Sequence, residues 1–248
     1  MDVLICIDDT DQKDGPGTGH LAQALSEEIE QRSWGTCSAI SRHQLFVHPD
    51  IPYTSHNSSL CFEAGIQAGR LMELIDFSGK FLHEKSAPGS DPGLCVAVAG
   101  QIVNKDKLTG FGRKAKQTVL TKNDAYELAE ELKIHLSEHG GTGQGVIGAL
   151  AGIGLRLSGN DGRFRGWYHF GREGDSISVK ALRSNRFIDA VKSETGETLT
   201  DDTVVFLGGD EQKTVLLDAI QVLLVKKIPQ GIRSSGWATL TKQEVKRY

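Results

Sequence analysis

The chain has 248 residues, of which 38% are hydrophobic and 24% are charged, and its net charge is −4. This length and apolar content are those of a globular protein with one large domain or two small ones. The acidic average does not predict nucleic-acid binding, although basic residues gather over residues 105–122 and 156–186.

The cysteines and the N-terminus indicate where the protein works. Four widely spaced cysteines include no Cys-x-x-Cys pair: Cys6, Cys37, Cys61 and Cys95. Buried free thiols in a reducing compartment explain this spacing better than a zinc site does. The N-terminus has no basic segment, and its apolar run is too short for a signal peptide or a membrane span. We therefore expect a cytoplasmic protein with no membrane partner.

The first predicted element is a buried strand over residues 3–7 that ends in three acids, Asp8, Asp9 and Asp11. Open α/β folds place ligands at the carboxyl ends of strands. Carboxylates this close repel one another unless a cation joins them, and Mg²⁺ prefers such oxygen ligands. The cluster predicts a magnesium site. The alternative is that Asp11 or Asp14 caps a helix while the other two acids are solvated turn residues.

A glycine-rich loop follows the acids and leads into an amphipathic helix over residues 21–29. Glycines let backbone amides approach an anion, and a helix N-terminus offers unpaired N–H groups and partial positive charge. We expect Gly17, Thr18 and Gly19 to hold phosphate in this way. His20 is a candidate acid or base beside them, or a bystander at the helix start. The loop is not a P-loop, because no Gly-Lys-Ser/Thr follows the glycines.

The middle of the chain alternates strands and helices, which predicts an α/β fold. Strands are predicted over residues 44–47, 60–64 and 94–99, and helices over 68–74 and 124–138, the latter capped by Asn123. The segment 143–154 contains G-x-G-x-x-G, but it leaves a helix instead of a strand, which excludes a dinucleotide-binding loop. We expect it to open a buried helix with a small-residue face. Its glycines serve close packing alone, or also bind an anion or ligand through Gly143, Gln144 and Gly145.

The last part of the chain predicts a strand over residues 202–207 and a strongly apolar helix over 214–226. Before them, residues 156–175 interleave arginines with Trp167, Tyr168 and Phe170. Such a stretch either binds nucleic acid or is a hairpin with solvated arginines.

Three segments together resemble the archaeal tRNA-isoleucine 2-agmatinylcytidine synthetase family: residues 7–11 with their glycine loop, residues 42–59 and residues 143–154. The resemblance covers about the first 170 residues. It implies a kinase-like α/β domain over residues 1–122, followed by a ferredoxin-like α+β domain over 123–248 with a C-terminal strand–helix extension. The OB-type and zinc-ribbon domains with which that family holds tRNA have no room here. We therefore do not expect tight tRNA binding from the isolated chain.

The resemblance also implies an enzyme that uses ATP and Mg²⁺ to activate a small substrate, such as an amine, by phosphoryl transfer or ATP cleavage. Asp8, Asp9 and Asp11 would hold Mg²⁺ with the ATP phosphates. Thr18 and His20 would be catalytic candidates at the glycine loop, where the family tends to have two adjacent threonines and this chain has Thr18 followed by glycine.

The segment 42–59 supplies the remaining catalytic candidates, Arg42 and His56. The family tends to carry a lysine and an arginine after its Ile-Pro-aromatic motif, and this chain has Thr54 and His56 instead. Two cations that would balance phosphate charge are therefore missing from this segment.

Two other functions fit the same residues. The chain is a non-catalytic module that binds a nucleotide or small ligand, or an accessory protein in tRNA modification, if the loss of the second threonine abolished catalysis. It is a phosphohydrolase if Asp9 is the nucleophile of an Asp-x-Asp pair with Asp11.

Overall fold

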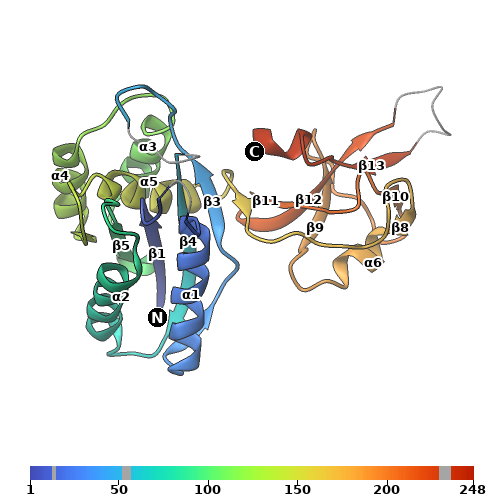
Figure 1. Ribbon diagram of the computed structural model, residues 1–248. Coiled ribbons are helices and arrows are strands. Elements are labelled where there is room, and N and C mark those ends of the chain that lie inside the picture. Colours follow the sequence, from blue (N-terminus) through green and yellow to red (C-terminus); the bar gives the residue numbers. More distant parts are fainter. Residues whose placement is uncertain (13–14, 52–56, 229–235) are drawn as a thin grey trace. The chain divides into compact units, whose positions relative to one another are not determined.

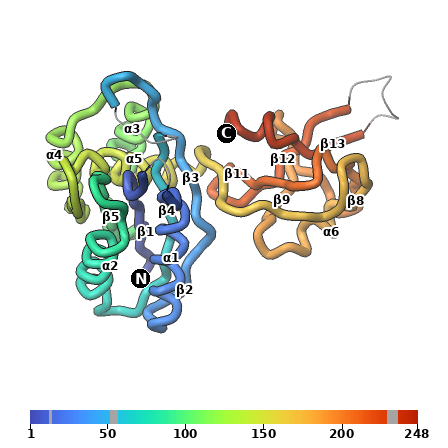
Figure 2. The backbone as a smooth tube through the Cα atoms, in the orientation of Figure 1, coloured from blue at the N-terminus to red at the C-terminus, as the bar shows by residue number. Residues whose placement is uncertain are grey.

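The computed structural model describes residues 1–12, 15–51, 57–228 and 236–248. They form two compact units, Met1–Ser158 and Gly159–Tyr248, which Figures 1 and 2 show in one orientation. The division falls after the long glycine-rich helix. Residues 123–158, which the resemblance assigns to the second domain, therefore pack with the first unit.

The first unit is built on an antiparallel sheet with the strand order β6-β5-β1-β4-β3, and β2 also pairs with β4. Its strands are β1 (Asp2–Asp8), β2 (Gly35–Cys37), β3 (Ser41–Gln44), β4 (Ser58–Ile66), β5 (Gly93–Val98) and β6 (His135–Glu138). Strand β1 lies between β4 and β5 and runs opposite to both. The acids therefore follow a central strand of an antiparallel sheet, instead of sharing the carboxyl edge of a parallel one.

Helices cover both faces of this sheet (Figure 1). They are α1 (Thr18–Gln31), α2 (Leu71–Lys85), α3 (Lys105–Lys114), α4 (Lys122–Leu132) and α5 (Gly145–Leu157), with a 3-10 turn at Ala99–Gln101. Val3, Ile5 and Ile7 of β1 pack in one core with α1 and α2. Leu4 and Cys6 pack in the opposite core with α3, α4 and α5. Burial on both faces explains why β1 is an unbroken apolar run.

Helix α5 presses its glycines against the sheet and its neighbours. A Cβ on Gly152 would lie 2.3 Å from Cys6 Sγ, and one on Gly154 would lie 2.1 Å from the carbonyl oxygen of Leu108. No side chain fits at such distances, so the helix can approach only because these residues are glycine. The predicted buried helix with a small-residue face is confirmed, and close packing explains these two glycines.

The second unit contains the strands β7 to β13 and has its own cores. The sheet order is β7-β11-β12-β13-β10-β8, with β9 beside β12. Strands β9 and β12 pair in parallel, as do β10 and β13. The elements are β7 (Arg163–Phe164), β8 (Ser176–Ser178), α6 (Val179–Arg183), β9 (Ala190–Ser193), β10 (Val204–Phe206), β11 (Thr214–Leu217), β12 (Ile220–Lys227), β13 (Trp237–Thr239) and a 3-10 turn at Glu244–Arg247.

The prediction of an apolar helix over residues 214–226 is wrong, because this segment is the hairpin β11–β12. Asp218 and Ala219 connect the strands with φ angles of 51° and 62°, as a tight two-residue hairpin turn requires. Leu223 and Val225 face one core while Val222 and Leu224 face another. A strand that is buried on both faces has no alternating pattern, so its sequence reads like a buried helix.

The predicted helix over residues 124–138 is too long. Helix α4 ends at Leu132 because Lys133 turns into the left-handed region with φ 56°, and the strand β6 follows. The cap is Thr121 instead of Asn123, since Thr121 and Asp124 form a reciprocal capping box.

The remaining elements overlap their predicted ranges to different degrees. The strands predicted over residues 60–64, 94–99 and 202–207 correspond to β4, β5 and β10. The strand predicted over 44–47 shares only Gln44 with β3, and the short helix predicted over 68–74 begins at Leu71 and continues to Lys85 as α2. In the described part of the chain, no helix combines the length and apolar character needed to cross a membrane.

Candidate functional site

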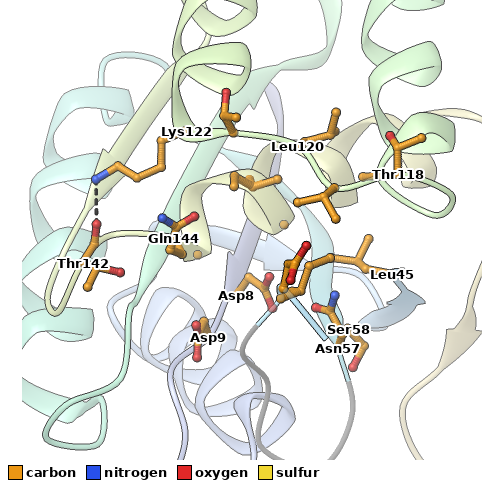
Figure 3. Close-up of a pocket in the computed structure, with 18 of the residues that line it drawn as sticks. Asp8, Asp9, Leu45, Asn57, Ser58, Thr118, Leu120, Lys122, Thr142 and Gln144 are labelled. Atoms are coloured by element: carbon orange, nitrogen blue, oxygen red, sulfur yellow. Dashed lines mark hydrogen bonds between the residues drawn. The ribbon is translucent and has the colours of Figure 1, made fainter. Parts of the chain in front are cut away.

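A cavity of about 660 Å³ opens in the first unit where β1 ends and β4 begins (Figure 3). The start of α1, the loop between α3 and α4 and the start of α5 complete its wall. Asp8, Asp9, Asp11 and Thr18 line one part of it, as do Gln144 and Gly145. The fold therefore brings the acid cluster and the second glycine-rich segment together, although more than a hundred residues separate them in the sequence.

The acids are placed by the end of β1 and by the packing of α5. Asp8 is the last residue of β1 and is only 8% exposed. A Cβ on Gly148 would lie 1.7 Å from Asp8 Oδ2, so this glycine makes room for the carboxylate. Asp9 has a φ of 52°, a left-handed conformation that Asp tolerates better than most residues. This turn ends the strand directly at the cavity.

Burial and mutual repulsion make two of these acids hard to ionise. Burial raises the pKa of Asp8 to about 8, with the charge of Asp9 contributing. Burial also raises the pKa of Asp9 to about 6, and the negative charges of Asp91 and Asp11 contribute to this rise to a smaller extent. A bound cation would favour the ionised carboxylates and reverse both effects.

The donor set suits Mg²⁺ in chemical type. It consists of hard oxygen atoms from Asp8, Asp9 and Asp11 with the hydroxyl of Thr18 beside them. Within the described residues, no three His, Cys, Asp or Glu side chains are arranged so that they could hold a metal ion. Mg²⁺ usually takes one or two carboxylates and fills its other positions with water and substrate phosphates. The site therefore fits a metal that enters together with a phosphate ligand.

Thr18 opens α1 and links it to the acids. Its hydroxyl donates to Asp11 Oδ1 over 2.9 Å, and its side chain is buried. The N-cap position belongs to Gly17, which has no side chain, so Asp11 does not cap the helix in the expected way. Asp14, the other expected cap, lies outside the described residues. Of the described residues of this loop and helix start, Thr18 lines the cavity, whereas Gly17, Gly19 and the exposed His20 do not.

The glycine loop before α5 already binds an anion, the carboxylate of Asp91. Asp91 Oδ1 accepts hydrogen bonds from the backbone amides of Thr142 and Gly143, the second over 3.2 Å. Asp91 Oδ2 accepts from the Thr142 hydroxyl over 2.9 Å. The amide of Gly143 therefore serves the loop itself, while Gln144 and Gly145 face the cavity. Sequence reasoning missed Asp91 because its partners are 51 and 52 residues away.

The segment 42–59 contributes through its second half. Arg42 is not part of the described cavity wall, but its Nε donates to Ser58 Oγ over 2.8 Å, and Ser58 lines the cavity with Asn57. His56 and Thr54 lie outside the described residues.

The rest of the cavity lining includes apolar side chains and one lysine that the sequence did not single out. Lys122 Nζ lies 2.7 Å from Glu138 Oε1 and donates to the carbonyl oxygen of Thr142 over 2.7 Å. The only signal for it was the basic region over residues 105–122. The apolar wall consists of Leu45, Ile51, Ala115, Val119, Leu120 and Ile147. A lining that has both carboxyl groups and apolar side chains suits a ligand with a phosphate end and a flat apolar end.

For the arginine-rich stretch over residues 156–175, one predicted alternative was a hairpin with solvated arginines, and Arg156 does not fit it. Arg156 belongs to α5, is 8% exposed and donates from Nε to Glu63 Oε1 over 3.1 Å, so it is not a solvated arginine. Trp167 is 40% exposed, and the ammonium groups of Lys213 and Lys242 lie 4.5 Å and 5.1 Å from its ring centroid.

Comparison with curated proteins places the chain near one group of archaeal proteins. It matches no protein-family model. Over 162 residues it is 28% identical to the tRNA 2-agmatinylcytidine synthetase TiaS of Methanosarcina acetivorans, a match that covers 63% of this chain and 36% of TiaS. The chain resembles TiaS over part of its length. It is also 30% identical over 154 residues to the uncharacterized protein MJ0921 of Methanocaldococcus jannaschii, covering 62% of this chain and 49% of that protein.

Solved structures of TiaS give the same result. The crystal structure of TiaS in complex with its tRNA and ATP matches with a TM-score of 0.54 and 30% identity, over 62% of this chain and 36% of that chain. The complex of TiaS with tRNA, AMPCPP and agmatine matches with a TM-score of 0.55 over 96% of this chain and 59% of that chain, but at 20% identity it supports the fold alone. The chain therefore has a TiaS-like mixed α/β fold and spans about half of the curated relatives' length or less.

Proposed function

We propose that the chain binds ATP with Mg²⁺ in the cavity of its first unit and uses them to activate a small substrate, such as an amine, by phosphoryl transfer or ATP cleavage. One observation carries this proposal: Asp8, Asp9, Asp11 and Thr18 share one cavity with the start of α5. The resemblance supports it, because TiaS, to which this chain is similar, has been solved in complex with its tRNA and ATP.

The domain roles follow the same resemblance. The kinase-like part would begin at β1, and the ferredoxin-like part would lie farther along the chain. The cavity draws on α4 and α5 as well as on β1 and α1, so the nucleotide site would use residues on both sides of position 122. Because the chain covers 36% of TiaS, tRNA is not part of the proposal.

Each residue of the site has a defined task in this proposal. The cluster of Asp8, Asp9 and Asp11 would supply one or two carboxylate ligands to Mg²⁺, which neutralises phosphate charge when it is bound. Asp11 orients the Thr18 hydroxyl toward the acids through their 2.9 Å hydrogen bond. The N-terminus of α1, which no described side chain caps, offers its dipole to a phosphate group. The apolar wall would receive the base and exclude water from it.

The direct test is the substitution Asp9→Asn. It removes one metal-binding charge while it keeps the size of the side chain, and we expect it to abolish Mg²⁺-dependent ATP turnover. Asp2→Asn is the matched control, because Asp2 lies at the other end of the same strand and should leave turnover unchanged. ADP, AMP and phosphate are measured separately, which also identifies the bond that is cleaved. Unchanged turnover in Asp9→Asn would contradict the assignment.

A second candidate function is a nucleotide-binding module without catalysis. Thr18 is followed by glycine, so the helix start offers one hydroxyl where the resembling family tends to have two. Calorimetry with ATP and Mg²⁺ followed by the product assay separates the candidates. Binding without any product supports the module, or an accessory role in tRNA modification, instead of the enzyme.

A further inference from the structure

Lys122 is the one basic side chain among the described residues that line the cavity. It is the first residue of α4, and its side chain is 29% exposed. Figure 3 shows it extended along the rim of the cavity to Thr142. Asp8, Asp9, Asp11 and Asp50 line the same cavity, so its carboxyl groups outnumber its one ammonium group.

A triphosphate would add further negative charge to this site, and one Mg²⁺ neutralises only part of it. Phosphate-binding sites supply the remaining positive charge through lysine or arginine. In the described wall, Lys122 is the one side chain that could supply this charge. Whether it can do so depends on the contacts that Lys122 makes in the absence of nucleotide.

Lys122 is held by contacts that can be exchanged. An ammonium group has three donors, and Lys122 directs two of them to Glu138 Oε1 and to the Thr142 carbonyl oxygen. Glu138 is 35% exposed and also accepts a hydrogen bond from the Tyr126 hydroxyl over 2.8 Å. It therefore keeps a donor and solvent if Lys122 leaves. Ion pairs this exposed contribute little to stability, about 0–1 kcal/mol by general experience, so replacing the carboxylate by a phosphate is not opposed.

We infer that Lys122 binds the phosphates of the nucleotide by exchanging Glu138 for a phosphate oxygen while it keeps the Thr142 carbonyl. Lys122 thus gives the site its specificity for polyphosphates, and Glu138 is the carboxylate that pairs with Lys122 in the absence of nucleotide. The hydrogen bond to Thr142 would join the bound phosphates to the loop before α5. The inference rests on the proposed function, because it requires that the cavity binds ATP with Mg²⁺.

The test compares variants whose effects have opposite signs. Dissociation constants are measured by calorimetry with Mg²⁺ and ATP, and with adenosine as a ligand without phosphate. We expect Lys122→Met to weaken ATP binding by about tenfold or more, because a charge-assisted hydrogen bond is lost, while adenosine binding changes less than about twofold. Lys122→Arg should restore most of the affinity for ATP. Glu138→Gln should tighten ATP binding by about two- to fivefold, because the competing charge is removed.

Tyr126→Phe is the matched control, since it removes a hydrogen bond to Glu138 without a change at Lys122. If Lys122 only fastened the loop to α4, Lys122→Met and Glu138→Gln would both weaken binding, and this result would overturn the inference. Equal ATP binding by Lys122→Met and the unsubstituted chain would also overturn it, while the proposed function would stand. Absence of ATP binding by the unsubstituted chain would overturn both. If Lys122→Met does not fold, the sign of the Glu138→Gln effect decides.

Discussion

At the scale of single residues, the site is organised around a buried carboxylate that is costly to ionise. Asp8 is fixed by strand pairing to Gly93 and by the space that Gly148 leaves for it. Burial raises the pKa of Asp8. By contrast, the exposed Glu138 has a lowered pKa, because Lys122 donates a hydrogen bond to it. A group held in an unfavourable state without its ligand is typical of a binding site.

The raised pKa of Asp8 predicts how stability depends on pH without Mg²⁺. Its carboxyl has a pKa of 3.8 in the unfolded chain and about 8 in the fold, so the folded protein binds an extra proton between these values. That stabilisation is present at low pH and is lost as the pH rises to about 8. His135 and His139 have lowered pKa values, mainly through burial, and act in the opposite direction below 6.5.

The histidines of the unfolded chain, with a pKa of 6.5, are still partly protonated just above that pH, so the slope of the unsubstituted chain is compared with that of Asp8→Asn, which has the same histidines. Between pH 6.5 and 8 we expect the free energy of unfolding of the unsubstituted chain to fall by about 1–2 kcal/mol relative to that of Asp8→Asn, as followed by urea denaturation. Asp8→Asn imitates the protonated acid and should lack this part of the slope. Equal slopes in the two chains would show that another group causes it.

Sequence alone could place the residues of the site that are neighbours in the chain. Asp8, Asp9, Asp11 and Thr18 lie within eleven positions, so one strand end and one helix start are enough to bring them together. Asp91 and Lys122 reach the site only through tertiary contacts, and their own surroundings in the sequence are an ordinary turn and a basic segment. Local patterns carry no information about such contacts.

At the scale of elements, α5 decides how the first unit is built. Gly152 lets the helix approach Cys6 of β1 closely, and the missing side chain of Gly148 leaves room for the Asp8 carboxylate. The first residues of α5 line the cavity. The sequence predicted this helix correctly, because a long apolar run rich in glycine and alanine is typical of a helix that packs closely in a core. The hairpin β11–β12 was mistaken for a helix, because a strand that is buried on both faces shows no alternating pattern. The end of α4 was missed, because the left-handed conformation of Lys133 has no signal in the sequence pattern.

Glycine substitutions in two helices test this role of α5. In Gly152→Ala the new Cβ would meet Cys6 Sγ at 2.3 Å and Ser59 Oγ at 2.5 Å, so the core has to shift. We expect a loss of about 1–3 kcal/mol of unfolding free energy in urea denaturation. Gly110→Ala in α3 is the matched control, since nothing beyond the local helix backbone lies within 4 Å of its added Cβ. It should stabilise the protein by up to about 1 kcal/mol, because alanine is the better helix former. Equal effects of the two substitutions would contradict the close packing of α5.

At the scale of the whole molecule, the two units differ in charge as well as in structure. The first unit has 20 Asp and Glu against 14 Lys and Arg, and the second has 12 against 14. Every described residue of the cavity wall belongs to the first unit, and the two cores that flank its sheet draw on no residue beyond it. In the proposed function, Mg²⁺ and Lys122 would together supply the positive charge that this acidic unit needs to hold a nucleotide.

A chain that ends at Ser158 should fold and bind ATP on its own, with a dissociation constant within about threefold of that of the full chain. The reason is that the cores and the described cavity wall remain complete in it. Because this unit is acidic, ATP should not bind when EDTA removes the metal, since the acids then repel the phosphates. Calorimetry of both chains, with Mg²⁺ and with EDTA, measures this. Binding that is lost in the shorter, folded chain would show that the second unit contributes to the site, and binding that persists in EDTA would contradict the metal assignment of Asp8, Asp9 and Asp11.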